Sequence, residues 1–271
     1  MFGPRLPYRY DHYTWLEMRD VVKRDPQPVV IIPVGSVEDH GHHLPLDVDN
    51  FTIGSICDEA AKRAPNEILL LPGIPYGFET HHMEFPGTID IKPRHLEDFV
   101  VDVTASVAHH GFRRILLADG HGSNMPILNI AARRTVLETE ALCAAFIWPS
   151  IIPDAIKQIR ESPRGGMAHA CELETSLYLH LNKGAVQMDK AVPDYNDHKD
   201  SQFHWQDLQY GSKIVFMDWW SRISKTGTIG DPTLATAEKG KIVFEASVTE
   251  LVKLVREFRG WTGMPRRDLH S

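Results

Sequence analysis

Short apolar runs alternate with amphipathic stretches along the first half of the chain. The runs over residues 29–34, 68–71 and 115–118 are rich in valine, isoleucine and leucine and are too short for buried helices, so each predicts a buried strand. A fourth strand is expected over 141–148. The stretches before and between them carry apolar residues at helical spacing and predict helices over about 14–24, 49–63, 95–110 and 125–137.

This order of strands and helices predicts the fold class. Buried strands joined by crossover helices form a parallel sheet with right-handed connections. We therefore expect an α/β protein, a three-layer α/β/α sandwich with a mostly parallel central sheet. No internal repeat, low-complexity tract or linker interrupts the pattern, so a single domain is expected over residues 1–271. In such a sheet the loops that follow successive strands meet at one edge, where ligands bind.

The second half of the chain has weaker patterns. A short helix is expected over 154–161, a loop-rich and extended segment over 183–218, and the last helix over 236–258. A further helix is expected over 168–181. It would place His169 and Glu172 on one face, because residues three positions apart are neighbours on a helix.

The composition and net charge of the chain argue against several classes of protein. Of the 271 residues, 42% are hydrophobic and 24% are charged, as in ordinary globular proteins. The net charge of −7 argues against a nucleic-acid-binding surface. No run approaches the roughly 20 apolar residues of a membrane span, and the first residues lack the apolar core of a signal peptide. Three isolated cysteines do not make a disulfide framework, so we expect a cytoplasmic protein that binds neither nucleic acid nor membrane.

The densest group of candidate ligands follows the first predicted strand. Glu38 and His40 are two positions apart, so in an extended segment their side chains leave on one face. Asp49 follows after a loop long enough to fold its carboxylate back over the pair. Carboxylate and imidazole groups are the donors of zinc, manganese and iron sites. The alternative reading is a polar loop with solvated histidines.

A second contribution is expected at the end of the strand over 115–118. His121 stands there between two glycines, which let the backbone come close to an ion or a substrate. Because the carboxyl ends of parallel strands meet at one sheet edge, His121 should lie beside Glu38, His40 and Asp49. Asp49 lies between the others and could bridge two ions about 3.5–4 Å apart, a common arrangement in hydrolases.

Several separated motifs resemble, in order, the signatures of the creatininase (creatinine amidohydrolase) family of metal-dependent hydrolases. They cover most of the chain and comprise residues 34–46 (Val-Gly-Ser-Val-Glu-Asp-His-Gly-His-His-Leu-Pro-Leu), 85–89 (Phe-Pro-Gly-Thr-Ile), 119–124 (Asp-Gly-His-Gly-Ser-Asn), 169–176 (His-Ala-Cys-Glu-Leu-Glu-Thr-Ser), 230–232 and 235–240. The resemblance implies a creatininase-like fold and a site for two divalent metal ions. Zinc is the expected ion, with manganese or iron as alternatives. Glu38, Asp49 and His121 would hold one ion, and His40 with Asp49 the other.

This chain departs from the family pattern at three positions. Ser123 stands where creatininase has a glutamate ligand, so either Glu172 or Glu174 completes the second metal site or the second ion is bound more weakly. Asp39 replaces a usual glutamine, and Asp119 replaces a usual asparagine. Both changes make the expected site more acidic than is typical of the family.

The resemblance also implies a reaction. His169 would act as the acid/base group, with Glu172 nearby, while the ions activate water against a small cyclic amide-like (C–N) substrate. Alternatives are a C–C bond hydrolase of a cyclic diketone such as 3-dehydro-scyllo-inosose, a formamide deformylase or a peptide-processing enzyme. A non-enzymatic alternative is a silent binding or scaffold protein on the same fold.

Three further features stay open at this point. The long loop over 72–93 is rich in glycine and proline, and its His81 and His82 could contact substrate or solvent. Trp219 and Trp220 could belong to the core or cover a substrate. Aromatic residues gather in the loop-rich second half and favour a homo-oligomer, a hexamer by family resemblance; they include Phe203, Trp205 and Phe216.

Overall fold

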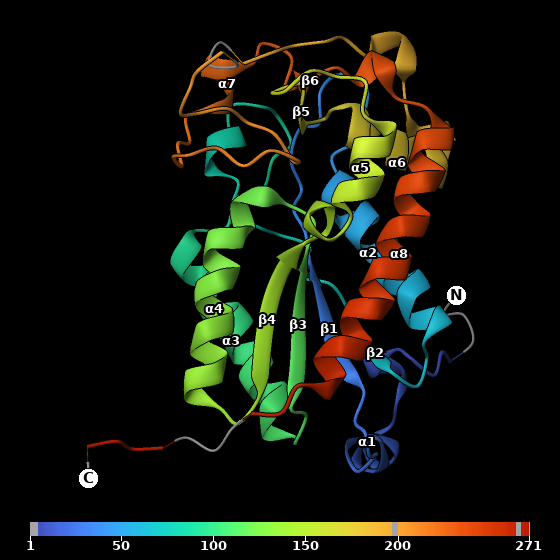
Figure 1. Ribbon diagram of the computed structural model, residues 1–271, viewed down its shortest axis with the longest axis vertical. Helices are drawn as coiled ribbons and strands as arrows, with labels where there is room; N and C mark the ends of the chain where they lie inside the picture. The colour runs from blue at the N-terminus through green and yellow to red at the C-terminus, as the bar shows by residue number, and fades with distance from the viewer. Residues whose placement is uncertain (1–4, 197–199, 264–266, 271) are drawn as a thin grey trace.

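The central sheet of the protein has four parallel strands in the order β2-β1-β3-β4 (Figure 1). The computed structural model describes residues 5–196, 200–263 and 267–270, and the other positions of the expected domain lie outside the described residues. The strands are β1 (Val29–Val34), β2 (Ile68–Leu70), β3 (Arg114–Asp119) and β4 (Leu142–Ile147). All four predicted strands are confirmed, with small shifts at their ends.

Helices cover both faces of this sheet (Figure 1). Side chains of a strand point alternately to its two faces, so Val29 and Ile31 enter one apolar core while Val30 and Ile32 enter the other. One face is covered by α3 (Pro93–His109) and α4 (Met125–Glu138), and the other by α2 (Val48–Arg63), α5 (Pro153–Ile159), α6 (Glu172–Asn182) and α8 (Ala237–Gly260). The short helix α1 (Trp15–Val22) lies below the strands in Figure 1 and packs against the same core as α3 and α4. The predicted three-layer α/β/α fold is confirmed.

The carboxyl ends of β1 and β3 lie next to each other, because Val34 pairs with Asp119 in the parallel register. The N-terminus of α2 packs directly on this edge. A Cβ atom at Gly120 would overlap the main-chain oxygen of Asp49, so only glycine allows so close an approach. This contact brings the loop after β1, the start of α2 and the loop after β3 together.

The helix predicted over 168–181 begins later than expected. Residues Met167–His169 form β5, which pairs antiparallel with β6 (Ile229–Gly230), and α6 starts at Glu172. The prediction that His169 and Glu172 share a helix face is therefore wrong. Its physical cause is a pairing partner some sixty residues away in the chain, which local hydrophobic spacing cannot indicate.

The remaining elements are short. They are α7 (Trp220–Ile223) and the 3₁₀ turns η1 (Tyr10–His12), η2 (Thr80–His82), η3 (Gly122–Asn124), η4 (Trp148–Ile151), η5 (Lys183–Ala185), η6 (Met188–Lys190) and η7 (Pro232–Leu234). Within the described part of the chain, no helix is both long and apolar enough to cross a bilayer.

Candidate metal centre and active site

Four of the predicted ligands meet at the edge where β1 and β3 end. Glu38 and His40 lie in the loop after β1, Asp49 in the first turn of α2, and His121 two residues after the end of β3. All four side chains are buried. His121 Nδ1 lies 3.0 Å from Glu38 Oε1 and 3.2 Å from Asp49 Oδ2, while His40 Nε2 lies 3.4 Å from Asp49 Oδ1. The carboxylate of Asp49 therefore stands between the two imidazoles.

These separations suit metal ligands. Atoms bound at about 2.0–2.2 Å to one zinc ion lie roughly 3–3.5 Å from one another. Both carboxylate oxygens of Glu38 and Nε2 of His40 are buried and lack a hydrogen bond among the described residues. Burying such acceptors without a partner is costly, and a cation would remove that cost. The residues present thus fit a metal centre.

Burial and mutual charge shift the pKa values of this group strongly. Burial raises the pKa of the Glu38 carboxyl, and the nearby Glu79 carboxylate raises it further. Burial alone would lower the pKa of His40, but the adjacent Asp49 carboxylate raises it to about 9. The pKa of Asp49 is depressed despite its burial, because His40 and His121 face it. Protons and a dication would compete for these ligands, so metal binding should release protons.

His169 and Glu174 reach the same cluster from the other side. His169, the last residue of β5, packs its ring 4.3 Å from that of His40, measured between centroids. Ligand-type atoms of His40, His169 and Glu174 all lie within 4.8 Å of one another. Burial raises the pKa of the Glu174 carboxyl. Glu174 is thus the glutamate of α6 that stands near the predicted second site.

Glu172 does not reach this cluster. Its buried carboxylate accepts hydrogen bonds from the main-chain N–H groups of Glu161 and Ser162 at 3.0 Å each. Lys239 Nζ of α8 lies 2.6 Å from its Oε1. The cause is the start of α6 at Glu172, which turns this side chain toward α8 rather than toward His169. Of the two glutamates that the sequence left open, the geometry brings only Glu174 to the site.

The loop over residues 72–93 supplies three residues that the sequence analysis missed or left open. No sequence motif marks Glu79, yet its Oε2 lies 2.8 Å from His121 Nε2. His82 Nδ1 lies 2.7 Å from Asp39 Oδ1, and His81 Nε2 lies 3.0 Å from the hydroxyl of Ser123. The length of this loop was the available signal, but nothing local shows which of its side chains turn inward.

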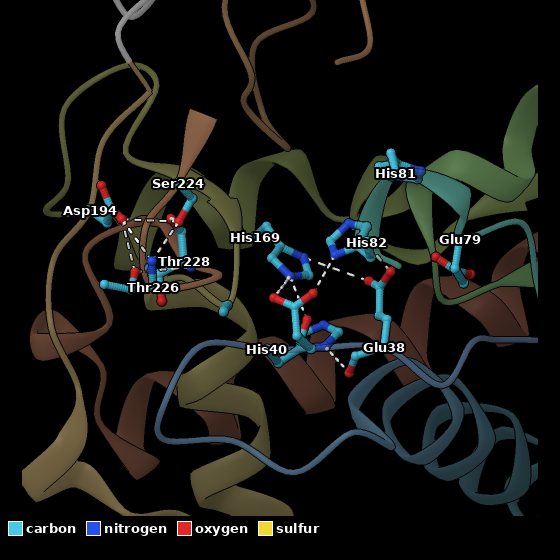
Figure 2. A network of polar contacts seen from close by, with 12 residues as sticks. Glu38, His40, Glu79, His81, His82, His169, Asp194, Ser224, Thr226 and Thr228 are labelled. Atoms are coloured by element: carbon cyan, nitrogen blue, oxygen red, sulfur yellow. Dashed lines mark hydrogen bonds and ion pairs between the residues drawn. The ribbon is translucent and has the colours of Figure 1, made fainter. Parts of the chain in front are cut away.

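A pocket of about 200 Å³ opens above the cluster. His82, His169 and Glu174 are part of its wall, and Trp220 of α7 stacks on His82 with ring centroids 4.4 Å apart. Trp220 therefore lines the site, whereas Trp219 is more exposed. No lysine or arginine among the described residues lines this pocket. Figure 2 shows His82 and His169 side by side, with Glu38 and His40 below them in this view.

Cys171 is not suited to act as a catalytic nucleophile. The side chain is buried next to Glu174, and burial together with that carboxylate raises the pKa of its thiol well above the ordinary value. A cysteine nucleophile needs the opposite shift, because the thiolate is the reactive form.

The sequence matches the family model described as "Creatininase: Creatinine amidohydrolase" over residues 11–255. A mycofactocin precursor peptide peptidase from Mycobacterium tuberculosis is 31% identical over 254 residues, which cover 89% of this chain and 88% of the relative. Creatinine amidohydrolase from Pseudomonas putida is 28% identical over 84% of this chain and 89% of its own. A 3-dehydro-scyllo-inosose hydrolase from Thermotoga maritima is 29% identical over 91% of this chain and 83% of its own.

Solved creatininase structures share the fold. A structure titled "Creatininase Mn" has a TM-score of 0.78 and 26% identity, covering 92% of this chain and 98% of that chain. A creatininase variant of Zn–Zn type has a TM-score of 0.77 and 26% identity, covering 92% of this chain and 97% of that chain. A family model that spans nearly the whole chain, together with these relatives, shows that the chain belongs to the creatininase family of hydrolases.

Proposed function

We propose that this chain is a metal-dependent hydrolase that holds two divalent cations and cleaves a C–N bond in a small cyclic amide-like substrate. The observation that carries the proposal is the convergence of Glu38, His40, Asp49 and His121 at ligand spacing. Both carboxylate oxygens of Glu38 and Nε2 of His40 are buried there and lack a hydrogen bond among the described residues. Zinc is the first choice, and manganese or iron are alternatives for such oxygen and nitrogen ligands.

Each cation has its own set of residues in this proposal. Glu38, Asp49 and His121 would hold the first. His40 and Asp49 would hold the second together with Glu174, which takes the place of the ligand lost at Ser123. Ser123 instead bonds to His81, and so it is engaged away from this set. Asp49 would bridge, because its two oxygens face His40 and His121 separately.

The chain's own groups move the proton. When bound, the cations would supply Lewis acidity that activates water and polarises the scissile carbonyl. His169 donates its Nε2–H to the main-chain oxygen of Asp39 at 2.8 Å, so its Nδ1 carries the lone pair. Burial and the neighbouring His40 hold the pKa of His169 well below the ordinary value, so the ring is neutral. His169 Nδ1 would accept the proton of water and then deliver it to the leaving nitrogen.

The relatives supply two alternatives to the cyclic amide. One acts on a precursor peptide and another on an inosose, so peptide cleavage and C–C cleavage of a cyclic diketone are the competing reactions. The pocket volume of about 200 Å³ lies below that of common ligand sites, which favours a small ring over a peptide chain. Turnover assays with cyclic amides, a cyclic diketone and a formamide separate these reactions.

Metal removal tests the proposed function. Chelation should abolish hydrolysis, and zinc or manganese should restore it, because the buried acceptors of Glu38 and His40 need a cation. Metal content and turnover should be measured on the same preparation. Full activity in demonstrably metal-free protein would rule out the metal-dependent mechanism, and metal binding without turnover of any tested substrate would favour a binding protein on this fold.

Glu174→Gln tests the second cation set. The variant should lose about one metal equivalent and most of its turnover, because a neutral amide is a weaker ligand than a carboxylate. Glu172→Gln is the matched control on the same helix. It should keep both equivalents and lose thermal stability, because it breaks the buried contact with Lys239. The opposite pattern of metal loss would assign the ligand to Glu172.

We further propose that residues 1–271 act as one domain of a cytoplasmic homo-oligomer, a hexamer by analogy with the family, with no nucleic-acid or membrane partner. Apolar side chains exposed in the loop-rich second half support an assembly, among them Phe203, Val215 and Trp219. Light scattering at micromolar concentration should report a multiple of the chain mass of 30.7 kDa. A monomer would contradict this expectation.

A further inference from the structure

Two imidazoles of the site are held by one residue, Asp39. Its carboxylate oxygen Oδ1 lies 2.7 Å from His82 Nδ1, and its main-chain oxygen lies 2.8 Å from His169 Nε2. The two rings lie side by side with centroids 4.9 Å apart. Their other nitrogens face Glu38, with His82 Nε2 3.4 Å from Oε2 and His169 Nδ1 3.8 Å from Oε1 (Figure 2).

These contacts decide which nitrogen of each ring carries the proton. A main-chain oxygen can only accept, so His169 must be protonated on Nε2. An ionised Asp39 carboxylate also only accepts, so His82 must be protonated on Nδ1. The lone pairs then lie on His82 Nε2 and His169 Nδ1, the two nitrogens that face Glu38. One residue thus sets opposite tautomers in two neighbouring rings.

Asp39 is itself fixed from the opposite side. Gly227 has a φ of +80°, and a Cβ atom there would overlap Oδ2 of Asp39. The loop that carries Gly227 is tied down by Asp194, whose Oδ2 accepts hydrogen bonds from Ser224 Oγ at 3.0 Å and Thr226 Oγ1 at 2.9 Å (Figure 2). Packed between this loop and His82, the buried Asp39 carboxylate has little room to turn away.

We propose that Asp39 is a positioning residue that fixes the tautomers of His82 and His169, and that His82 Nε2 is a second acceptor beside His169 Nδ1 in the site. Both histidines line the pocket. Two adjacent lone pairs can hold two N–H or O–H donors of a substrate, or orient one water, without either ring having to turn. The inference rests on the proposed function, since that function places a substrate and a water before these nitrogens.

Ring nitrogen-15 chemical shifts of histidine-labelled protein report the tautomers directly. They are measured with and without zinc. The wild type should show Nδ1–H in His82 and Nε2–H in His169. Asp39→Ala removes the carboxylate but keeps the main-chain oxygen, so His82 should move to the Nε2–H form that free imidazole favours, while His169 stays unchanged.

Asp39→Asn is the matched control. Its amide oxygen still accepts from His82 Nδ1–H, so this tautomer should persist. Asp39→Ala should lower kcat roughly ten- to a hundredfold at unchanged metal content, the usual effect of losing a residue that hydrogen-bonds to active-site groups and orients them. Asp39→Asn should lower kcat less.

Two results would overturn the inference. One is the opposite tautomer in either ring of the wild-type protein, a measurement that does not depend on the folding of any variant. The other is an Asp39→Ala variant in which His82 keeps Nδ1–H. Because the tautomers are read without turnover, the two proposals fail separately: metal-dependent hydrolysis with wrong tautomers contradicts only this inference, and correct tautomers without hydrolysis contradict only the proposed function.

Discussion

Asp49→Asn should be the most damaging single change to the proposed metal centre. Each oxygen of Asp49 faces a different imidazole, His40 at 3.4 Å and His121 at 3.2 Å. The asparagine amide presents one oxygen and one NH₂ group, which only donates, so it cannot join two cations as a carboxylate does. Substitution of a residue that only hydrogen-bonds to a metal ligand already lowers metal affinity about 10–100-fold. Loss of the proposed bridging ligand should therefore lower metal affinity more than about a hundredfold, and turnover should fall with it.

Asp47→Asn is the control for this prediction. Asp47 lies at the start of the same helix, and its substitution by asparagine removes the same charge. Its Oδ1 accepts a hydrogen bond from the Tyr178 hydroxyl and does not face the cluster. Metal titration by calorimetry and metal analysis should show two equivalents in this control. An Asp49→Asn protein that binds two ions and turns over normally would exclude the bridging role.

His169→Ala should lower kcat by roughly two to four orders of magnitude and keep near-native metal content. This is the usual contribution of a general acid/base. The structural reason is that the ring of His169 is held in place in the pocket wall. Its Nε2–H donates to the main-chain oxygen of Asp39, and its Nδ1 lies 3.8 Å from Glu38 Oε1. The effect should appear in single-turnover rates as well as at steady state, because the proton transfer belongs to the chemical step.

His43→Ala is the matched histidine control. His43 is equally buried and comes from the same loop as His40, but its Nε2 bonds to the Thr175 hydroxyl at 2.8 Å and it does not line the pocket. It should lose stability and keep its turnover per folded molecule. Loss of metal in His169→Ala would make His169 a ligand, and unchanged turnover would remove it from the mechanism.

The sequence alone determined the sheet and the first four ligand candidates. Apolar runs of strand length predicted β1 to β4, and the parallel register of β1 and β3 then brings Glu38 and His121 to one edge. This works because a buried strand must be apolar on both faces and because parallel strands end together. Asp49 could be placed for the same reason, since it begins the crossover helix that leaves this edge.

Only the tertiary structure decided the second half of the site. His169 stands at the end of β5 because Met167 and His169 pair with distant residues of β6, and this pairing turns Glu172 toward Lys239 and leaves Glu174 at the cluster. Irregular loops carry no periodic signal. The inward turns of Glu79 and His82 therefore arise from long-range contacts, Glu79 with His121 and His82 with Asp39, that no local pattern encodes.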